Sequence, residues 1–241
     1  RERHAPDAPD APRYRGESLL DWCERRIADP AAVSLLDEHF RSHPDIVGFS
    51  AERFYGGRLQ LLTTLRPPAS NGTAALELVH VTNGQRGRGD VNREEAGHVL
   101  ERLRTLLADH DPEAPATTIA VLSPFRAQAD HLDGRVRREF DAASLDRHRL
   151  VVGTAHELQG EERDVVLFSA VVDERSSGGS LAFLSRADIL NVSITRARHR
   201  QVLFLSRDPD RFDDTTLFGS YVRYVARGAI PVTARHTGAG G

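Results

Sequence analysis

The segment DVVLFSAVV, residues 164–172, is apolar at every position except Asp164 at its start and Ser169 within it. A strand with one face in water alternates apolar and polar residues. A continuous apolar run of this length is instead typical of a strand that is buried on both faces. Because parallel sheets are covered by helices on both faces, this segment predicts the interior of a parallel sheet.

The flanking sequence continues with alternating strands and helices. Apolar runs predict further strands over residues 33–36, 76–82, 118–123, 150–154 and 202–206. Apolar spacing and capping residues predict helices over residues 18–30, 44–57, 92–107, 127–140, 186–199 and 217–226. The third of these helices opens with Asn92 and Glu95, a pair spaced like a capping box. The predicted fold class is therefore α/β, with helices on both faces of a parallel sheet.

Three polar segments, residues 38–44, 123–128 and 154–162, each follow a predicted strand. Ligands of open parallel sheets bind at the carboxyl ends of the strands. We therefore expect these three segments to lie together at that edge of the sheet.

The composition excludes several classes of protein. The chain has 241 residues and a net charge of −3, and all 32 of its Lys and Arg residues are Arg. Without lysine it can hold neither a complete P-loop nor a lysine-dependent catalytic site. No apolar run approaches the roughly 20 residues that cross a bilayer. The polar start and the single Cys23 favour a cytoplasmic protein without a signal peptide.

The ends of the chain differ from its middle. We expect residues 1–17 to be disordered, because they include the low-complexity run APDAPDAP, and residues 231–241 to be a flexible tail. The chain contains no Met, so we expect it to be a piece of a longer protein.

Three motifs have ordinary explanations that outweigh a ligand site. His156 and Glu157 begin like a zinc-protease helix, but Gly160 stands where the second histidine is required. His39 and His43 lie four residues apart with no third ligand nearby, so we interpret them as structural. The glycines at 84, 87 and 89 match neither phosphate-binding fingerprint, and we expect a flexible connection there. We predict no metal site in this chain.

The segment NVSITRAR, residues 191–198, falls on the predicted helix that precedes the strand at 202–206. On such a helix Arg196 points away from the face that carries Asn191, Thr195 and Arg198. An arginine there is either a surface charge or a group that reaches a phosphate bound between two domains.

Four segments together resemble a known family. LDEHFRSHP (36–44) is similar to a Gln-Tyr-Arg-Met-His-Pro motif, and SPFRAQ (123–128) is similar to a Thr-Pro-Tyr motif with a following Gln. GTAHELQGEERD (153–164) resembles motif V of helicases, and NVSITRAR resembles motif VI. In this order they resemble the C-terminal RecA-like domain of superfamily 1 helicases, in the group of the nonsense-mediated-decay helicase and the replication helicase-nuclease. The resemblance covers about residues 18–206.

The resemblance implies a RecA-like, P-loop NTPase-type parallel sheet over residues 18–230. In this family ATP and Mg²⁺ bind between two RecA-like domains, and the N-terminal one, absent here, holds most of the metal. The residues carried over as catalytic are Arg41 and Arg196. Those carried over as ATP-binding are Phe40, Gln159, Gly160 and Glu162. Those carried over as contacts to single-stranded DNA or RNA are Ser123, Thr154 and His156. Three positions depart from the family pattern: His39 replaces Gln, Phe40 replaces Tyr and His156 replaces the usual Asp.

The implied function is the C-terminal motor domain of an ATP-dependent helicase or translocase that moves 5′ to 3′ on a single strand. Alone, this fragment is expected not to hydrolyse ATP. The alternative is a non-catalytic RecA-like module that binds nucleic acid or a protein, although such a module has no use for Arg41 and Arg196 together. A nuclease is not favoured, because its carboxylate and lysine site is missing.

Overall fold

The computed structural model describes residues 19–29, 32–34, 36–62, 74–109, 114–228 and 232–234. The segment expected to be disordered, 1–17, lies outside these residues, as does the expected tail apart from 232–234. The chain forms two compact units, Arg1–Asp37 and Glu38–Gly241. Residues 18–37, which the resemblance assigned to the RecA-like domain, thus fall in the first unit.

The first unit contains helix α1 (Leu19–Glu24), where the guanidinium of Arg26 lies 4.6 Å from the centre of the Trp22 ring. The strand expected over residues 33–36 is wrong, because Val33, Ser34 and Leu36 adopt no strand conformation. Leu36 is 90% exposed. A few apolar residues without a neighbouring strand have no partner for their backbone hydrogen bonds.

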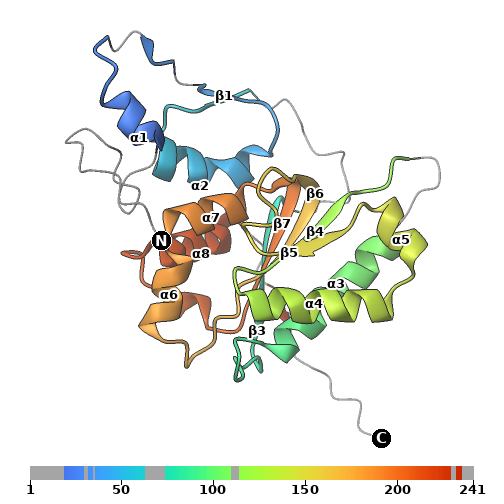
Figure 1. Ribbon diagram of the computed structural model, residues 1–241. Coiled ribbons are helices and arrows are strands. Elements are labelled where there is room, and N and C mark those ends of the chain that lie inside the picture. Colours follow the sequence, from blue (N-terminus) through green and yellow to red (C-terminus); the bar gives the residue numbers. More distant parts are fainter. Residues whose placement is uncertain are drawn as a thin grey trace, which may run out of the picture. The chain divides into compact units, whose positions relative to one another are not determined.

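The second unit is built on a six-stranded sheet (Figure 1). Its strands are β3 (Leu76–Val81), β4 (Ile119–Leu122), β5 (Val151–Gly153), β6 (Arg163–Ser169), β7 (Ala197–Leu205) and β8 (Val232–Ala234). They lie in the order β5-β4-β6-β7-β3-β8, and every neighbouring pair is parallel. The predicted α/β fold class is confirmed.

Helices cover both faces of this sheet (Figure 1). On one face pack α3 (Arg93–Ala108) and α4 (Arg126–Glu139), followed by the short α5 (Ala142–Arg147). The other face carries α2 (Pro44–Tyr55), α6 (Gly178–Leu184), α7 (Ala187–Ile194) and α8 (Leu217–Gly228). A 3₁₀ turn, η2 (Pro209–Arg211), precedes α8.

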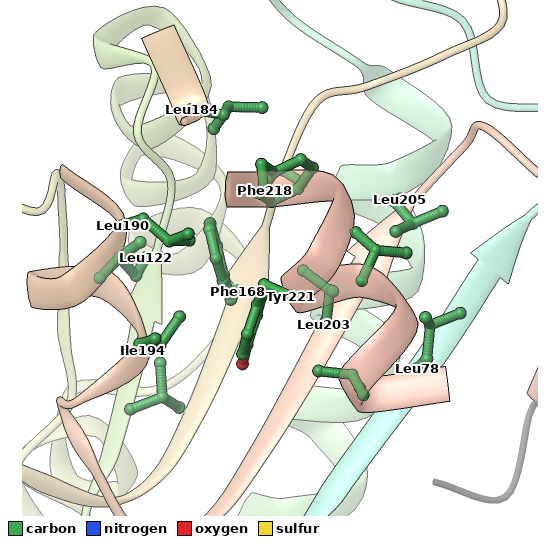
Figure 2. Close-up of a cluster of buried hydrophobic side chains, with 14 of the residues drawn as sticks. Leu78, Leu122, Phe168, Leu184, Leu190, Ile194, Leu203, Leu205, Phe218 and Tyr221 are labelled. Carbon is green, nitrogen blue, oxygen red and sulfur yellow. The ribbon is translucent and has the colours of Figure 1, made fainter. Parts of the chain in front are cut away.

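The core is divided by the sheet into two clusters, because neighbouring residues of a strand point to opposite faces. Phe168 of β6 belongs to the cluster with α7 and α8, whereas Leu167 beside it belongs to the cluster with α3 and α4. Figure 2 shows Phe168 and Tyr221 at the centre of the first cluster. The buried hydroxyl of Tyr221 donates a hydrogen bond of 2.8 Å to Oε1 of Gln201.

Two elements near the four motifs differ from the sequence-based prediction. β1 (Glu38–His39) pairs with β2 (Gln60–Leu61) in a separate two-stranded parallel sheet. The helix expected over 186–199 ends at Ile194, and β7 begins at Ala197. Residues 197–199 belong to the strand because β7 pairs with β6 from Ala197 onward. This tertiary pairing outweighs the local helical pattern of these residues.

The sheet also continues past residue 230, the expected end of the domain. The short strand β8 pairs with β3 and occupies the edge of the sheet. Three residues are too few for an apolar pattern to show, and the free backbone groups of β3 supply the pairing. In the part of the chain that the structure describes, no helix is both long and apolar enough to cross a membrane.

Candidate functional site

The amino ends of β6 and β7 lie side by side, because Arg163 and Ala197, the first residues of the two strands, are partners in the ladder. The backbone N–H of Arg163 donates to the carbonyl of Arg196 over 3.1 Å. Glu162 and Arg196, one residue before each strand, therefore lie at the same edge. This edge is formed by sequence positions more than 30 residues apart.

The segment 38–44 is held against this edge by two interactions. The backbone N–H of His43 donates to the carbonyl of Arg198 over 2.7 Å. The guanidinium of Arg41 forms an ion pair with the carboxylate of Glu162. We call Arg41, Glu162 and Arg196 the arginine cluster.

Arg196 is half-buried and fixed by hydrogen bonds to its own protein. Its Nε donates to the carbonyl of Val192 over 3.0 Å, and its Nη1 and Nη2 donate to the Glu161 carbonyl and to Thr195 Oγ1 over 3.3 and 3.0 Å. Burial lowers the pKa of Arg196, Glu162 opposes this shift, and the charge of Arg41 adds to it. A guanidinium nevertheless stays protonated in proteins, so the site holds a fixed positive charge.

The arginine cluster combines two guanidinium groups with one carboxylate. The pKa of His39 is lowered, first by burial and then by the charge of Arg41, so this neighbour is neutral near pH 7. Its Nε2 accepts a hydrogen bond of 3.0 Å from the backbone N–H of Ser42, which shapes the turn that carries Arg41. The cluster is therefore left with excess positive charge, the condition under which planar guanidinium groups bind phosphates.

The other residues expected to bind ATP lie close to Arg41 or Glu162 in the sequence. Phe40 precedes Arg41 and is 56% exposed, so its ring is available for stacking. Gln159 and Gly160 are exposed in the loop before Glu162. Gly160 has φ +87°, a conformation that a residue with a side chain adopts only under strain, so this turn requires glycine.

A second group of residues lies at the opposite, carboxyl edge of the sheet. Thr154 follows β5, and Ser123 follows the neighbouring β4. The side chain of Glu157 accepts hydrogen bonds from the backbone N–H and the hydroxyl of Thr154, over 2.9 and 3.1 Å. The same carboxylate pairs with Arg126, the first residue of α4. We call Thr154, Glu157 and Arg126 the threonine cluster.

The three residues expected to contact nucleic acid differ in their accessibility. His156 is exposed, and Thr154 is largely buried with its donors engaged by Glu157. Ser123 is completely buried, and its hydroxyl accepts a 3.3 Å hydrogen bond from the backbone N–H of Phe125. The structure therefore does not place the Ser123 side chain at the surface.

The expectation that all three polar segments meet at the carboxyl edge is wrong. Segment 38–44 begins with β1 of the small sheet and is tied by His43 to the amino end of β7. Segment 154–162 leaves β5 at the carboxyl edge and enters β6 at the amino edge, so it contributes Thr154 to one cluster and Glu162 to the other. Only segment 123–128 lies where it was expected.

Sequence reasoning missed the roles of Glu157 and Arg126. The spacing of Thr154 and Glu157 matches a capping box, a signal that was present in the sequence. Arg126 also pairs with Asp130, four residues along α4, at 3.9 Å, and nothing local marks its contact with Glu157, 31 positions away. His43 uses its Nδ1 to accept from the Asp45 N–H over 3.2 Å at the start of α2.

Within the described residues, no group of three or more His, Cys, Asp or Glu side chains is placed to hold a metal ion.

Comparison with known proteins identifies the family to which this chain belongs. A family model described as an AAA domain matches residues 16–208. The chain belongs to that family. This AAA domain is 26% identical over 179 residues to the probable helicase MAGATAMA 3 of Arabidopsis thaliana, which covers 69% of the chain and 21% of that protein.

Two further relatives of the AAA domain are also named as helicases. Helicase sen1 of Schizosaccharomyces pombe is 26% identical over 203 residues, covering 79% of the chain and 11% of that protein. The putative helicase MOV-10 of Gallus gallus is 26% identical over 211 residues, covering 75% of the chain and 22% of that protein. The resemblance to helicases drawn from the four motifs is confirmed, and the chain spans less than a quarter of the length of these relatives.

Among solved structures, the C-terminal domain of a possible DNA helicase from Lactobacillus plantarum WCFS1 is 13% identical with a TM-score of 0.44. The match covers 81% of this chain and 99% of that domain.

Proposed function

We propose that this AAA domain is the C-terminal motor domain of an ATP-dependent helicase or translocase acting on single-stranded DNA or RNA. The observation that carries the proposal is the arginine cluster, in which the guanidinium groups of Arg41 and Arg196 lie on one edge beside the carboxylate of Glu162. An N-terminal RecA-like domain of the same protein would supply the P-loop and hold most of the Mg²⁺. The binding of ATP between the domains would complete one site from two halves.

In this proposal the arginine cluster binds the phosphate end of ATP. Arg196 is fixed by its three hydrogen bonds, whereas Arg41 is exposed and is released from Glu162 when a phosphate competes for it. Both guanidinium groups stabilise charge that develops on the γ-phosphoryl group, an effect of about 10³ to 10⁵ in rate for such arginines. Phe40 stacks on the base, and Gln159, Gly160 and Glu162 line the site.

A single strand would bind at the carboxyl edge, through Thr154, His156 and the backbone around Ser123. Phosphate contacts of this kind do not read sequence. The nine residues 154–162 connect this edge to the arginine cluster, so closure of the domains on ATP alters both ends of one short segment. This is how binding of the strand and hydrolysis of ATP would be coupled.

The alternative function is a non-catalytic RecA-like module. It is favoured by one observation, that Arg41 and the Thr154 donors are already paired with the carboxylates of Glu162 and Glu157. A module of this kind would keep those pairs closed and would not turn over ATP.

The test replaces each arginine by Ala in a chain extended to include the N-terminal domain. We expect Arg41→Ala and Arg196→Ala each to lower kcat by about 10² or more with a smaller effect on ATP affinity, because the guanidinium acts mainly in the transition state. Lys at either position should restore little, since a point charge cannot replace the planar fork. The measurement is steady-state phosphate release in the presence of single-stranded nucleic acid.

Arg198→Ala is the matched control. Arg198 lies in β7 two residues beyond Arg196, and its side chain is directed to Asp164 at 3.5 Å, outside the arginine cluster. Its replacement should leave kcat nearly unchanged. Equal and small losses for Arg196→Ala and Arg198→Ala would refute the motor assignment in favour of the non-catalytic module.

A further inference from the structure

We propose that the threonine cluster is a binding site for one phosphate of a nucleic-acid backbone, and that the Glu157 carboxylate occupies this site when no strand is bound. The inference rests on the proposed function and deepens it. It assigns Arg126 as a strand-binding residue and Glu157 as an internal competitor of the strand.

The donors around Glu157 form the set that a phosphate requires. One carboxylate oxygen accepts from the Thr154 N–H and hydroxyl over 2.9 and 3.1 Å, and the other pairs with the Arg126 guanidinium. A backbone amide, a hydroxyl and an arginine are common donors to phosphate oxygens in protein–nucleic acid complexes. A carboxylate and a phosphodiester both present two charged oxygens to such donors.

A purely local role explains only half of these contacts. The N–H of Leu158 donates to the Thr154 carbonyl over 3.0 Å, so residues 154–158 form a helical turn in which Glu157 caps the N–H of Thr154. That cap needs one oxygen and no partner from another element. The second oxygen pairs with Arg126, the first residue of α4. Arg126 lies 31 positions before Glu157 in the sequence and belongs to a different element.

The pair is also accessible to a ligand. The side chains of Glu157 and Arg126 are 44% and 58% exposed, so the carboxylate can rotate into water without disturbing the core. The hydrogen bond from Arg126, followed by that from the Thr154 N–H, lowers the pKa of Glu157, so the competitor is an anion at neutral pH. An exposed ion pair of this kind contributes little to stability, and a phosphate can displace it at small cost.

The experiment measures binding of fluorescein-labelled oligothymidylate and oligouridylate to the 241-residue chain by anisotropy at two salt concentrations. Glu157→Gln removes the competing charge but keeps an acceptor for the Thr154 N–H. We expect it to bind about three- to tenfold more tightly than the wild type, the effect of one unit charge a few ångströms away in water. The slope of log affinity against log salt should become steeper by up to about 0.7, the value for one additional phosphate contact on a single strand.

A second variant tests the assignment of Arg126. Arg126→Gln should weaken binding of the wild type, and combined with Glu157→Gln it should cancel the gain. A gain from Glu157→Gln that persists without Arg126 would show that the two side chains do not share a phosphate site and would overturn the proposal.

Glu174→Gln is the control for overall charge. Glu174 pairs with Arg211 over 2.9 Å and accepts from the Asp208 N–H over 3.0 Å, and the two side chains are 45% and 65% exposed. This variant loses the same charge in a matched setting, and its affinity should change less than about twofold, because exposed charges are screened over distance. An equal gain from both variants would overturn the proposal.

The outcomes separate this inference from the proposed function. If the wild type binds the strands and Glu157→Gln binds no more tightly, the inference is wrong while the motor assignment stands. If no variant binds either strand at the lower salt concentration, the inference and the nucleic-acid part of the proposed function both fail.

Discussion

Glu95 is a single carboxyl group on which several elements converge. It is completely buried in α3, where its carboxylate accepts from the Ser169 hydroxyl, the Val171 N–H and the Ser206 hydroxyl over 2.6, 2.8 and 3.2 Å. Burial raises its pKa to about 7, although these hydrogen bonds act in the opposite direction. One side chain thus joins α3 to the carboxyl ends of β6 and β7.

The raised pKa of Glu95 predicts that the free energy of unfolding falls as the pH rises. Its pKa is raised in the folded state, so its contribution is complete below about pH 4.5 and is lost as pH passes through about 7. The loss attributable to this group is about 3 kcal/mol. Urea unfolding of the wild type and of Glu95→Gln at pH 5 and pH 8 measures it as the difference between their pH dependences.

The comparison with Glu95→Gln is needed because other groups titrate in the same range. Burial lowers the pKa of His39 and of His131, so each of these histidines makes stability rise with pH. The Gln variant keeps both histidines and removes only the carboxyl group. Parallel pH dependences in the two proteins would contradict the prediction.

At the scale of one element, α3 begins with the Asn92 cap that the sequence indicated but lacks the second bond of a capping box. The side chain of Asn92 caps the helix by accepting from the Glu95 N–H over 3.0 Å, as the spacing indicated. The reciprocal bond of a capping box is not made, because the Asn92 N–H donates to Gln128 Oε1 over 2.9 Å instead. The Glu95 side chain is thereby free for its interactions with the strands.

Glycines within helices provide a second prediction at this scale. A Cβ added at Gly97 in α3 or Gly134 in α4 meets nothing within 4 Å. Each change to Ala should therefore raise the free energy of unfolding by about 0.5–1 kcal/mol, because alanine loses less backbone entropy in a helix. Urea unfolding of each single variant measures the change.

Gly219 in α8 is the contrasting position. A Cβ there would lie 2.0 Å from the carbonyl oxygen of Asp213 and 2.6 Å from Thr216 Oγ1. Gly219→Ala should lower the free energy of unfolding by about 1–3 kcal/mol, the usual result of overpacking. A stabilisation equal to that of Gly134→Ala would show that the start of α8 does not pack as described.

At the scale of the whole molecule, the chain contains the arginines of the proposed phosphate site but no lysine to cradle the β- and γ-phosphates. The 241-residue chain alone is therefore expected to show no ATP turnover, with or without single-stranded nucleic acid. Phosphate release is the measurement, and a chain extended by the proposed N-terminal domain is the positive control. Turnover near 1 s⁻¹ by the 241-residue chain, within the ordinary range for enzymes, would contradict the division of the site between two domains.

The fold class and the family could both be predicted from the order of the amino acids. Continuous apolar strands such as residues 164–172 can be buried only inside a covered sheet, and the structure has them there, in β6 and just beyond it. The four motifs were sufficient for the resemblance to helicases, since their order and spacing lie along the chain itself.

The places where those motifs meet could not be predicted from the amino-acid order and depend on how the strands pair. Arg41 reaches Glu162 across 121 positions, and Arg196 joins them because β6 and β7 pair from their first residues. The same pairing ends α7 early and places Arg198 in a strand. The physical reason is that periodicity records which face of an element is buried. It does not record strand order or pairing, which determine the sheet edge that each loop reaches.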